Sequence, residues 1–172
     1  MIHESDKVND LVITESDLNF QKIYSKPYFP KGLEEDLKKA NLLLLPYEGF
    51  KTTKGPVFPE QTMEFYKFIK NYDSNKLIGD ICISDEDYAE LELHADLITL
   101  SSMIVTMGVL PIATGLIANY LYQKIQERNH KTDLKVKVNI TVVDGDKSKN
   151  IFYEGDAEKF EETLKTANEF NI

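Results

Sequence analysis

Cys82 is the single thiol of the chain. A cysteine acts as a nucleophile when a nearby histidine or a helix N-terminus lowers its pKa. Cys82 instead stands between Ile81 and Ile83, and a cysteine in such an apolar segment usually packs as a small hydrophobic side chain. We therefore expect Cys82 in the core, without a catalytic role. A lone cysteine also excludes a disulfide scaffold.

Glu90, Glu92 and His94 alternate with apolar residues, so on a β-strand they would share one face. Carboxylate and imidazole groups gathered in this way can bind a metal ion. The spacing is loose, however, and neighbouring acids are usually solvated surface groups. We therefore expect no metal and no cofactor here. The other histidines, His3 and His130, stand beside charged residues and are expected to be exposed.

The segment from Pro46 to Pro59 is the best candidate for a ligand-binding loop. It follows a predicted buried strand, and open α/β sheets bind ligands at the carboxyl ends of their strands. The loop, taken as 46–60, contains both charged residues and glycines: Tyr47, Glu48, Gly49, Lys51, Lys54 and Gly55. It matches neither GxxxxGK[ST] nor GxGxxG, and the chain contains no GxSxG, HExxH or CxxC motif. A purely structural connection is the alternative to a ligand loop.

Several elements would position this loop. Acidic residues in its first turn predict a short helix over Leu33–Ala40. The apolar run Leu42–Leu45 predicts a strand buried on both faces. An apolar stripe predicts a helix over Glu60–Asn71, and Lys76–Ser84 is a second strand candidate. Residues 1–30 give no clear prediction.

Residues 85–96 leave two interpretations open. The alternation of apolar and polar residues from Ala89 to Asp96 favours a strand. Asp85 as an N-cap, followed by Glu86 and Asp87, favours a helix. We give a slight preference to the helix.

The 27 residues from Leu97 to Gln123 carry no charge, and about 20 apolar residues suffice to cross a membrane. The polar residues within the segment and Gly108, Pro111 and Gly115 argue against one straight helix. We therefore expect an apolar segment over Leu97–Val109 and a helix from Pro111 to Arg128. Membrane attachment through 97–123 stays as an alternative.

That helix, within 110–128, carries a broad apolar face made of Ile112, Leu116, Ile117, Tyr120, Leu121 and Ile125. Such a face either packs as the central core helix or exceeds what one small domain can cover and binds a partner. The small residues Gly108, Ala113, Gly115 and Ala118 would allow close approach of another backbone.

The last third of the chain predicts a hairpin followed by a helix. Leu134–Val143 alternates as a strand with one apolar face, and Asp144-Gly145 is a strong hairpin dipeptide. Asn150–Glu154 would form the return strand, and Asp156 would cap a helix with Phe160 and Leu164 on one face, extended by Ala167 or Asn168. The predicted fold class is α+β (or α/β): a mixed sheet with a long apolar helix and this hairpin–helix unit, residues 134–170.

Composition and length limit the classes of protein to which this chain can belong. The 172 residues include 20 basic and 29 acidic side chains, so the net charge is 20 − 29 = −9. An acidic balance disfavours nucleic-acid binding, and 42% hydrophobic residues exclude overall disorder. The length predicts a single domain over 1–172, with a sub-boundary near 96–110 as the alternative. No secretory signal is apparent in Met1–Asp10, which together with one thiol favours the cytoplasm.

The C-terminal 65 or so residues carry a pattern of helix, strand, turn, strand and helix. It runs through Leu110-Pro-Ile-Ala-Thr-Gly-Leu-Ile-Ala-Asn-Tyr-Leu, Lys135-Val-Lys-Val-Asn-Ile-Thr-Val-Val-Asp-Gly-Asp and Tyr153-Glu-Gly-Asp-Ala-Glu-Lys-Phe-Glu-Glu. This pattern resembles small effector-associated components of bacterial conflict and antiviral defence systems. The resemblance implies a non-catalytic adaptor, and it assigns no functional residue.

The leading functional prediction is therefore a non-enzymatic bacterial interaction or adaptor protein, in a defence or signalling system. It would assemble through the apolar 110–128 helix with a protein partner or with further copies of itself. The alternatives are a small-ligand-binding protein or enzyme that uses the 46–60 loop, and a membrane-associated protein.

Overall fold

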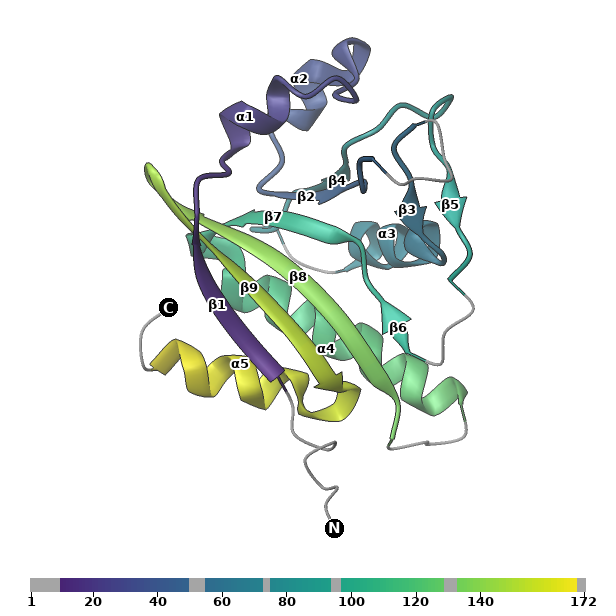
Figure 1. The fold of residues 1–172 in the computed structure, drawn as a ribbon, viewed down its shortest axis with the longest axis vertical. Helices are drawn as coiled ribbons and strands as arrows, with labels where there is room; N and C mark the ends of the chain where they lie inside the picture. The colour runs from purple at the N-terminus through teal and green to yellow at the C-terminus, as the bar shows by residue number, and fades with distance from the viewer. Residues whose placement is uncertain (1–9, 50–54, 73–74, 94–96, 129–132, 170–172) are drawn as a thin grey trace.

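A mixed β-sheet forms the centre of the molecule (Figure 1). The computed structural model describes residues 10–49, 55–72, 75–93, 97–128 and 133–169. The strand order is β1-β9-β8-β7-β2-β4, with β6 also beside β8. These strands are β1 (Asp10–Ser16), β2 (Leu42–Leu45), β4 (Gly79–Ile81), β6 (Ile98–Thr99), β7 (Ser102–Thr106), β8 (Lys135–Asp144) and β9 (Lys147–Asp156). Helices and a mixed sheet together confirm the α+β class.

The helices cover the two faces of the sheet unequally. They are α1 (Phe20–Tyr24), α2 (Glu34–Leu37), α3 (Thr62–Asn71), α4 (Leu110–Glu127) and α5 (Phe160–Glu169). The larger core cluster joins α3, α4 and α5 to the sheet, and α4 lies behind β8 and β9 in Figure 1. The smaller cluster joins α1 and α2 to β2 and β7 on the opposite face. Within the described residues, no helix lies in front of β8 and β9.

The strand β2 is buried on both faces, as its sequence predicts. Leu42 and Leu44 belong to the larger core cluster, whereas Leu43 and Leu45 belong to the smaller one. Strand β2 pairs with β7 on one side and β4 on the other. Its four leucines therefore fill both layers of the core. The second predicted strand, Lys76–Ser84, is reduced to the three residues of β4.

The C-terminal hairpin–helix unit forms as predicted. Strands β8 and β9 pair along their whole length, from Lys135↔Asp156 to Asp144↔Lys147. Gly145 makes the turn with a φ of 67°, which a residue without Cβ adopts at little cost. The return strand is longer than the predicted Asn150–Glu154, because β9 pairs with β8 from Lys147 to Asp156. It also pairs with β1 through seven residue pairs.

The start of the last helix differs from the prediction. A 3₁₀ turn over Ala157–Lys159 precedes α5, and the Asp156 side chain makes no capping hydrogen bond. Its carboxylate accepts a hydrogen bond from Lys135 on β8 instead. Phe160 and Leu164 are buried as predicted, and Ala167 is half-buried. The side chain of Asn168 lies outside the described residues.

The uncharged segment 97–123 is not one helix. It contains β6, β7 and a 3₁₀ turn over Met107–Val109, and α4 then begins at Leu110 with Pro111 in its first turn. This confirms the predicted division near Pro111. Among the described helices, none is both long enough and apolar enough to cross a membrane.

The interface predicted on α4 is wrong, because its residues lie in the core of the chain itself. Side chains from α3 and α5 and from β8 and β9 cover them. Five of the six are buried and Ile112 is half-buried; the buried ones are Leu116, Ile117, Tyr120, Leu121 and Ile125. The large apolar side chain that α4 does expose is Tyr122, at 63%. The core-helix interpretation therefore holds.

The slight preference for a helix over residues 85–96 is also wrong. Residues 85–87 form a turn, and β5 (Glu90–Leu91) pairs in parallel with β3 (Phe58–Pro59). The Tyr88 ring stacks on the Phe58 ring with centroids 5.2 Å apart. These contacts with a distant segment override the local capping pattern at Asp85. Residues 94–96 lie outside the described residues.

Candidate functional site

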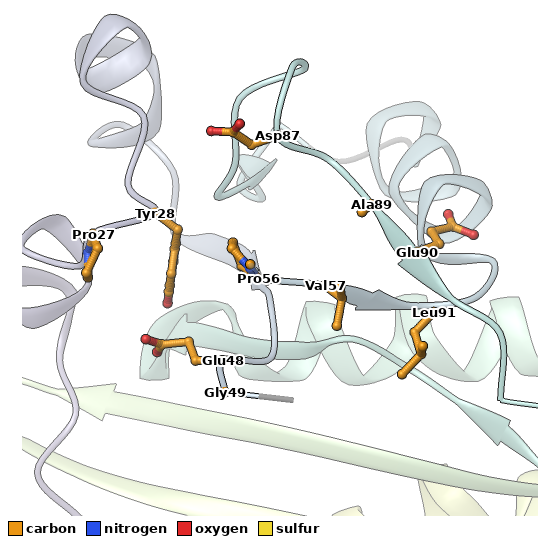
Figure 2. Close-up of a pocket in the computed structure, with 11 residues that line it drawn as sticks. Pro27, Tyr28, Glu48, Gly49, Pro56, Val57, Asp87, Ala89, Glu90 and Leu91 are labelled. Carbon is orange, nitrogen blue, oxygen red and sulfur yellow. The ribbon is translucent and has the colours of Figure 1, made fainter. Parts of the chain in front are cut away.

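A groove of about 610 Å³ lies beside the predicted ligand loop (Figure 2). Three stretches of chain line it: residues 27–28 after α1, the two ends of the 46–59 segment, and residues 87–91. The lining residues are Pro27, Tyr28, Glu48, Gly49, Gly55, Pro56, Val57, Asp87, Ala89, Glu90 and Leu91. The volume falls within the range of small-ligand pockets, which is about 300–1,000 Å³.

Backbone hydrogen bonds fix the walls of this groove. Tyr47 and Val57 bond to each other in both directions, with N···O distances of 2.7 and 3.1 Å. Gly49 has a φ of 75°, a conformation that glycine adopts without strain. The Phe58 N–H donates to the Ala89 carbonyl at 2.9 Å, which ties the third stretch to the second. The groove is therefore built on paired backbone within its described part.

Carboxylates and apolar side chains line the groove together. Figure 2 shows Tyr28 and Glu48 facing each other, Asp87 above them, and Val57 and Leu91 to their right. Glu48 accepts a hydrogen bond from Lys26 at 3.1 Å. Burial raises the pKa of Tyr28, and the nearby Cys82 and Glu48 raise it further. Tyr28 is therefore a neutral hydroxyl at physiological pH, able to donate to a ligand.

Glu90 has a structural role at the start of α3. Its carboxylate accepts from the backbone N–H of Gln61 at 2.9 Å and of Met63 at 3.0 Å, and also from the Tyr88 hydroxyl. These N–H groups belong to the first turn of α3, which has no intrahelical partners for them. Gln61, with a φ of 69°, offers no side-chain cap. A residue 29 positions away therefore caps α3.

Replacing Glu90 with glutamine should lower the free energy of unfolding by about 1 kcal/mol at neutral pH, because the helix N-terminus loses a charged acceptor. Burial alone would raise the pKa of Glu90, but the hydrogen bonds from Tyr88, Met63 and Gln61 outweigh it and lower the pKa. A lowered carboxyl pKa stabilises the fold above the ordinary glutamate pKa, and this contribution is lost as pH falls through the lowered value. Urea unfolding across this acid range should show the variant and the wild type converging.

The matched control is Glu86→Gln, an exposed carboxylate in the same segment. It should change the free energy of unfolding by less than about 0.5 kcal/mol, as surface substitutions generally do. Equal stabilities of wild type and Glu90→Gln at neutral pH would contradict the capping role.

Cys82 is buried, as its apolar neighbours predict. Burial raises its pKa to about 12, and the charge of Asp80 adds to this. The thiolate, which is the nucleophilic form, is therefore scarce at neutral pH. Cys82 packs with α1 and α2 in the smaller core cluster.

The structure brings only part of the predicted loop into the groove. Glu48, Gly49 and Gly55 line it, whereas Tyr47 lines a separate hollow on the sheet. Lys51, Lys54 and the histidines His3, His94 and His130 lie outside the described residues. Among the residues that the structure describes, no group of three or more metal-binding side chains occurs.

Sequence reasoning missed Tyr28, Asp87 and Leu91 as groove residues. They come from segments that the sequence left unassigned or misassigned, and only the pairing of β3 with β5 carries residues 87–91 to the loop. No spacing within the sequence could have predicted this.

The protein thus has an α+β fold and a groove that carboxylates and apolar side chains line together. A scan against models of protein families, a search of curated proteins and a search of solved structures each returned no match.

Proposed function

We propose that the protein is a non-enzymatic interaction protein that binds a basic segment of a partner protein in the groove of Figure 2. The observation that carries the proposal is that two carboxylates, Glu48 and Asp87, line the same groove as apolar side chains. A lysine or arginine side chain fits such a site, because its ammonium or guanidinium pairs with carboxylates while its stem packs on apolar surface.

The charge of the whole chain supports a basic partner. With a net charge of −9, the protein attracts cationic segments at long range. The neutral Tyr28 hydroxyl also lines the groove and can hydrogen-bond to a peptide backbone. This proposal replaces assembly through the α4 face, which is buried.

The proposal extends to setting and compartment. The resemblance of the C-terminal part to effector-associated components would make the partner an effector of a bacterial conflict or defence system. Such a protein would act in the cytoplasm.

The test is binding of short fluorescent peptides that carry two arginines among neutral residues, measured by fluorescence polarisation. Wild type should bind them, and the binding should weaken as salt rises. The double variant Glu48→Gln with Asp87→Asn should bind at least about tenfold more weakly, which corresponds to about 1.4 kcal/mol. The control Glu86→Gln removes one nearby charge outside the groove and should bind nearly as wild type.

Three results would contradict the proposal. They are no binding of the arginine peptides, equal binding of peptides in which glutamine replaces arginine, and unchanged affinity in the double variant. A further comparison uses a simple polyamine: if it displaced the peptides at equal affinity, the groove would instead be a small-ligand site, the alternative predicted for the 46–60 loop.

A further inference from the structure

A second hollow, of about 290 Å³, lies on the sheet face that no described helix covers in front of β8 and β9 (Figure 1). It is lined by Tyr47, Thr99, Leu100, Ser102, Lys137, Val138, Asn139 and Phe152. Its lining residues come from β6, β7, β8 and β9, from Leu100 after β6 and from Tyr47, which follows β2. The hollow shares no lining residue with the groove proposed above.

The hollow lies where the pairing with β8 is interrupted between β6 and β7. Ile98 and Thr99 pair with Val136 and Lys137, and β7 resumes pairing with β8 only at Met103↔Ile140. Between them, the Leu100 N–H bonds to the Lys137 carbonyl and the Ser101 hydroxyl bonds to the Leu45 carbonyl. The interrupted strand leaves a depression whose floor is the polar side of β8.

The floor offers a positive charge and uncharged hydrogen-bonding groups. On β8, Val136 and Val138 face the core. The alternate residues Lys137 and Asn139 therefore lie on the opposite face of the strand. Within the described part of the chain, Lys137 forms no ion pair, although Glu154 is its register partner on β9. Asn139 donates to the Ser102 hydroxyl at 3.2 Å, which orients the amide beside the lysine.

Aromatic side chains flank this floor. Phe152 on β9 is the register partner of Asn139. Tyr47 follows the end of β2, three strands across from β9 in the order β9-β8-β7-β2. At about 4.8 Å per strand, the two backbones are about 14 Å apart. Both side chains line the hollow, one on each side of the strand that carries Lys137. Burial raises the pKa of Tyr47, so it is a neutral phenol at physiological pH.

We propose that this hollow binds a small aromatic carboxylate, with the carboxylate on the Lys137 ammonium and the ring between Phe152 and Tyr47. The free lysine selects an anion, and the rings select a flat apolar body. The volume lies at the small end of ligand pockets, which fits a ligand of one ring and not a nucleotide.

The experiment is an NMR titration of ¹⁵N-labelled protein with benzoate. Saturable shifts are expected at the amides of Thr99, Ser102 and Asn139. Lys137→Gln should weaken benzoate binding at least about tenfold, and Phe152→Leu should weaken benzoate more than cyclohexanecarboxylate. The control Lys149→Gln removes a lysine of β9 that does not line the hollow. Thermal melts check that each variant is folded.

Four results would overturn the proposal: no saturable shift with benzoate, shifts centred elsewhere, unchanged affinity in Lys137→Gln, and equal affinity for inorganic phosphate or benzamide. Equal binding of phosphate would mean a general anion site, and equal binding of benzamide would remove the role of the lysine. Because none of the variants touches the groove, arginine-peptide binding should be unaffected in each of them.

Discussion

Replacing Leu116 with alanine should lower the free energy of unfolding by about 3–5 kcal/mol. Leu116 is fully buried at the centre of α4 and belongs to the larger core cluster. The substitution removes buried apolar atoms and leaves a cavity that the surrounding side chains fill only in part. The measurement is chemical unfolding followed by circular dichroism.

The matched control is Tyr122→Ala on the same helix. Tyr122 is 63% exposed, so its removal should change the free energy of unfolding by about 0.5 kcal/mol or less. If the apolar face of α4 were a contact surface between molecules, Leu116→Ala would instead change the oligomeric state and leave the stability of the monomer nearly unchanged. A small loss of stability together with dissociation of an assembly would refute the core assignment.

Replacing Glu64 with glutamine should lower the free energy of unfolding by about 2 kcal/mol. The carboxylate of Glu64 on α3 contacts the Lys124 ammonium at 2.5 Å and accepts from the Tyr120 hydroxyl at 2.6 Å. Lys124 is buried, with 5% of its surface exposed, and its other carboxylate partner is Glu127 at 3.2 Å. Breaking a buried ion pair from one side costs about 3–5 kcal/mol, and we expect less here because Glu127 remains.

Replacing the other partner, Lys124, should lower the free energy of unfolding by less. Lys124→Met keeps the volume of the buried side chain and removes its charge, and the remaining Glu64 is half-exposed and can be solvated by water. We therefore expect Lys124→Met, and the double variant Lys124→Met with Glu64→Gln, to be closer to wild type than Glu64→Gln alone. Equal losses for the two single variants would contradict this asymmetry.

The pH dependence gives an independent check of this contact. Burial alone would raise the pKa of Glu64, but the hydrogen bonds from Lys124 and Tyr120 and the charge of Lys124 outweigh it and lower the pKa. Because the pKa is lowered in the folded state, the stabilisation is present above the ordinary glutamate pKa and is lost as pH falls through the lowered value. Glu64→Gln should therefore lose less stability than the wild type on acidification.

Periodic segments with local partners could be predicted from the sequence. The alternation of Val136, Val138 and Ile140 predicts β8, the Asp144-Gly145 dipeptide predicts the hairpin, and the apolar run predicts the doubly buried β2. In each case, the side chains that define the pattern also make the core contacts, so the local pattern and the packing agree.

Contacts between distant segments could not be predicted. The cap of α3 is Glu90, and the edge of the sheet is β1, whose seven residues gave no clear pattern but pair with β9. The groove joins residues 27–28 to 87–91. Such pairings depend on the tertiary fold, because the stabilising groups are tens of residues apart in the chain.

The sequence by itself determined the acidic charge, the α+β class, the hairpin–helix unit and the core position of Cys82. Charge and composition are properties of the residues, and hairpin and strand patterns arise from neighbours. Only the tertiary structure decided whether the apolar face of α4 meets the chain's own sheet or a partner. Amphipathic periodicity predicts that the apolar face of a helix is buried, but it does not identify the residues that bury it. Here the sheet, α3 and α5 cover it, because the apolar side chains of α4 pack against theirs.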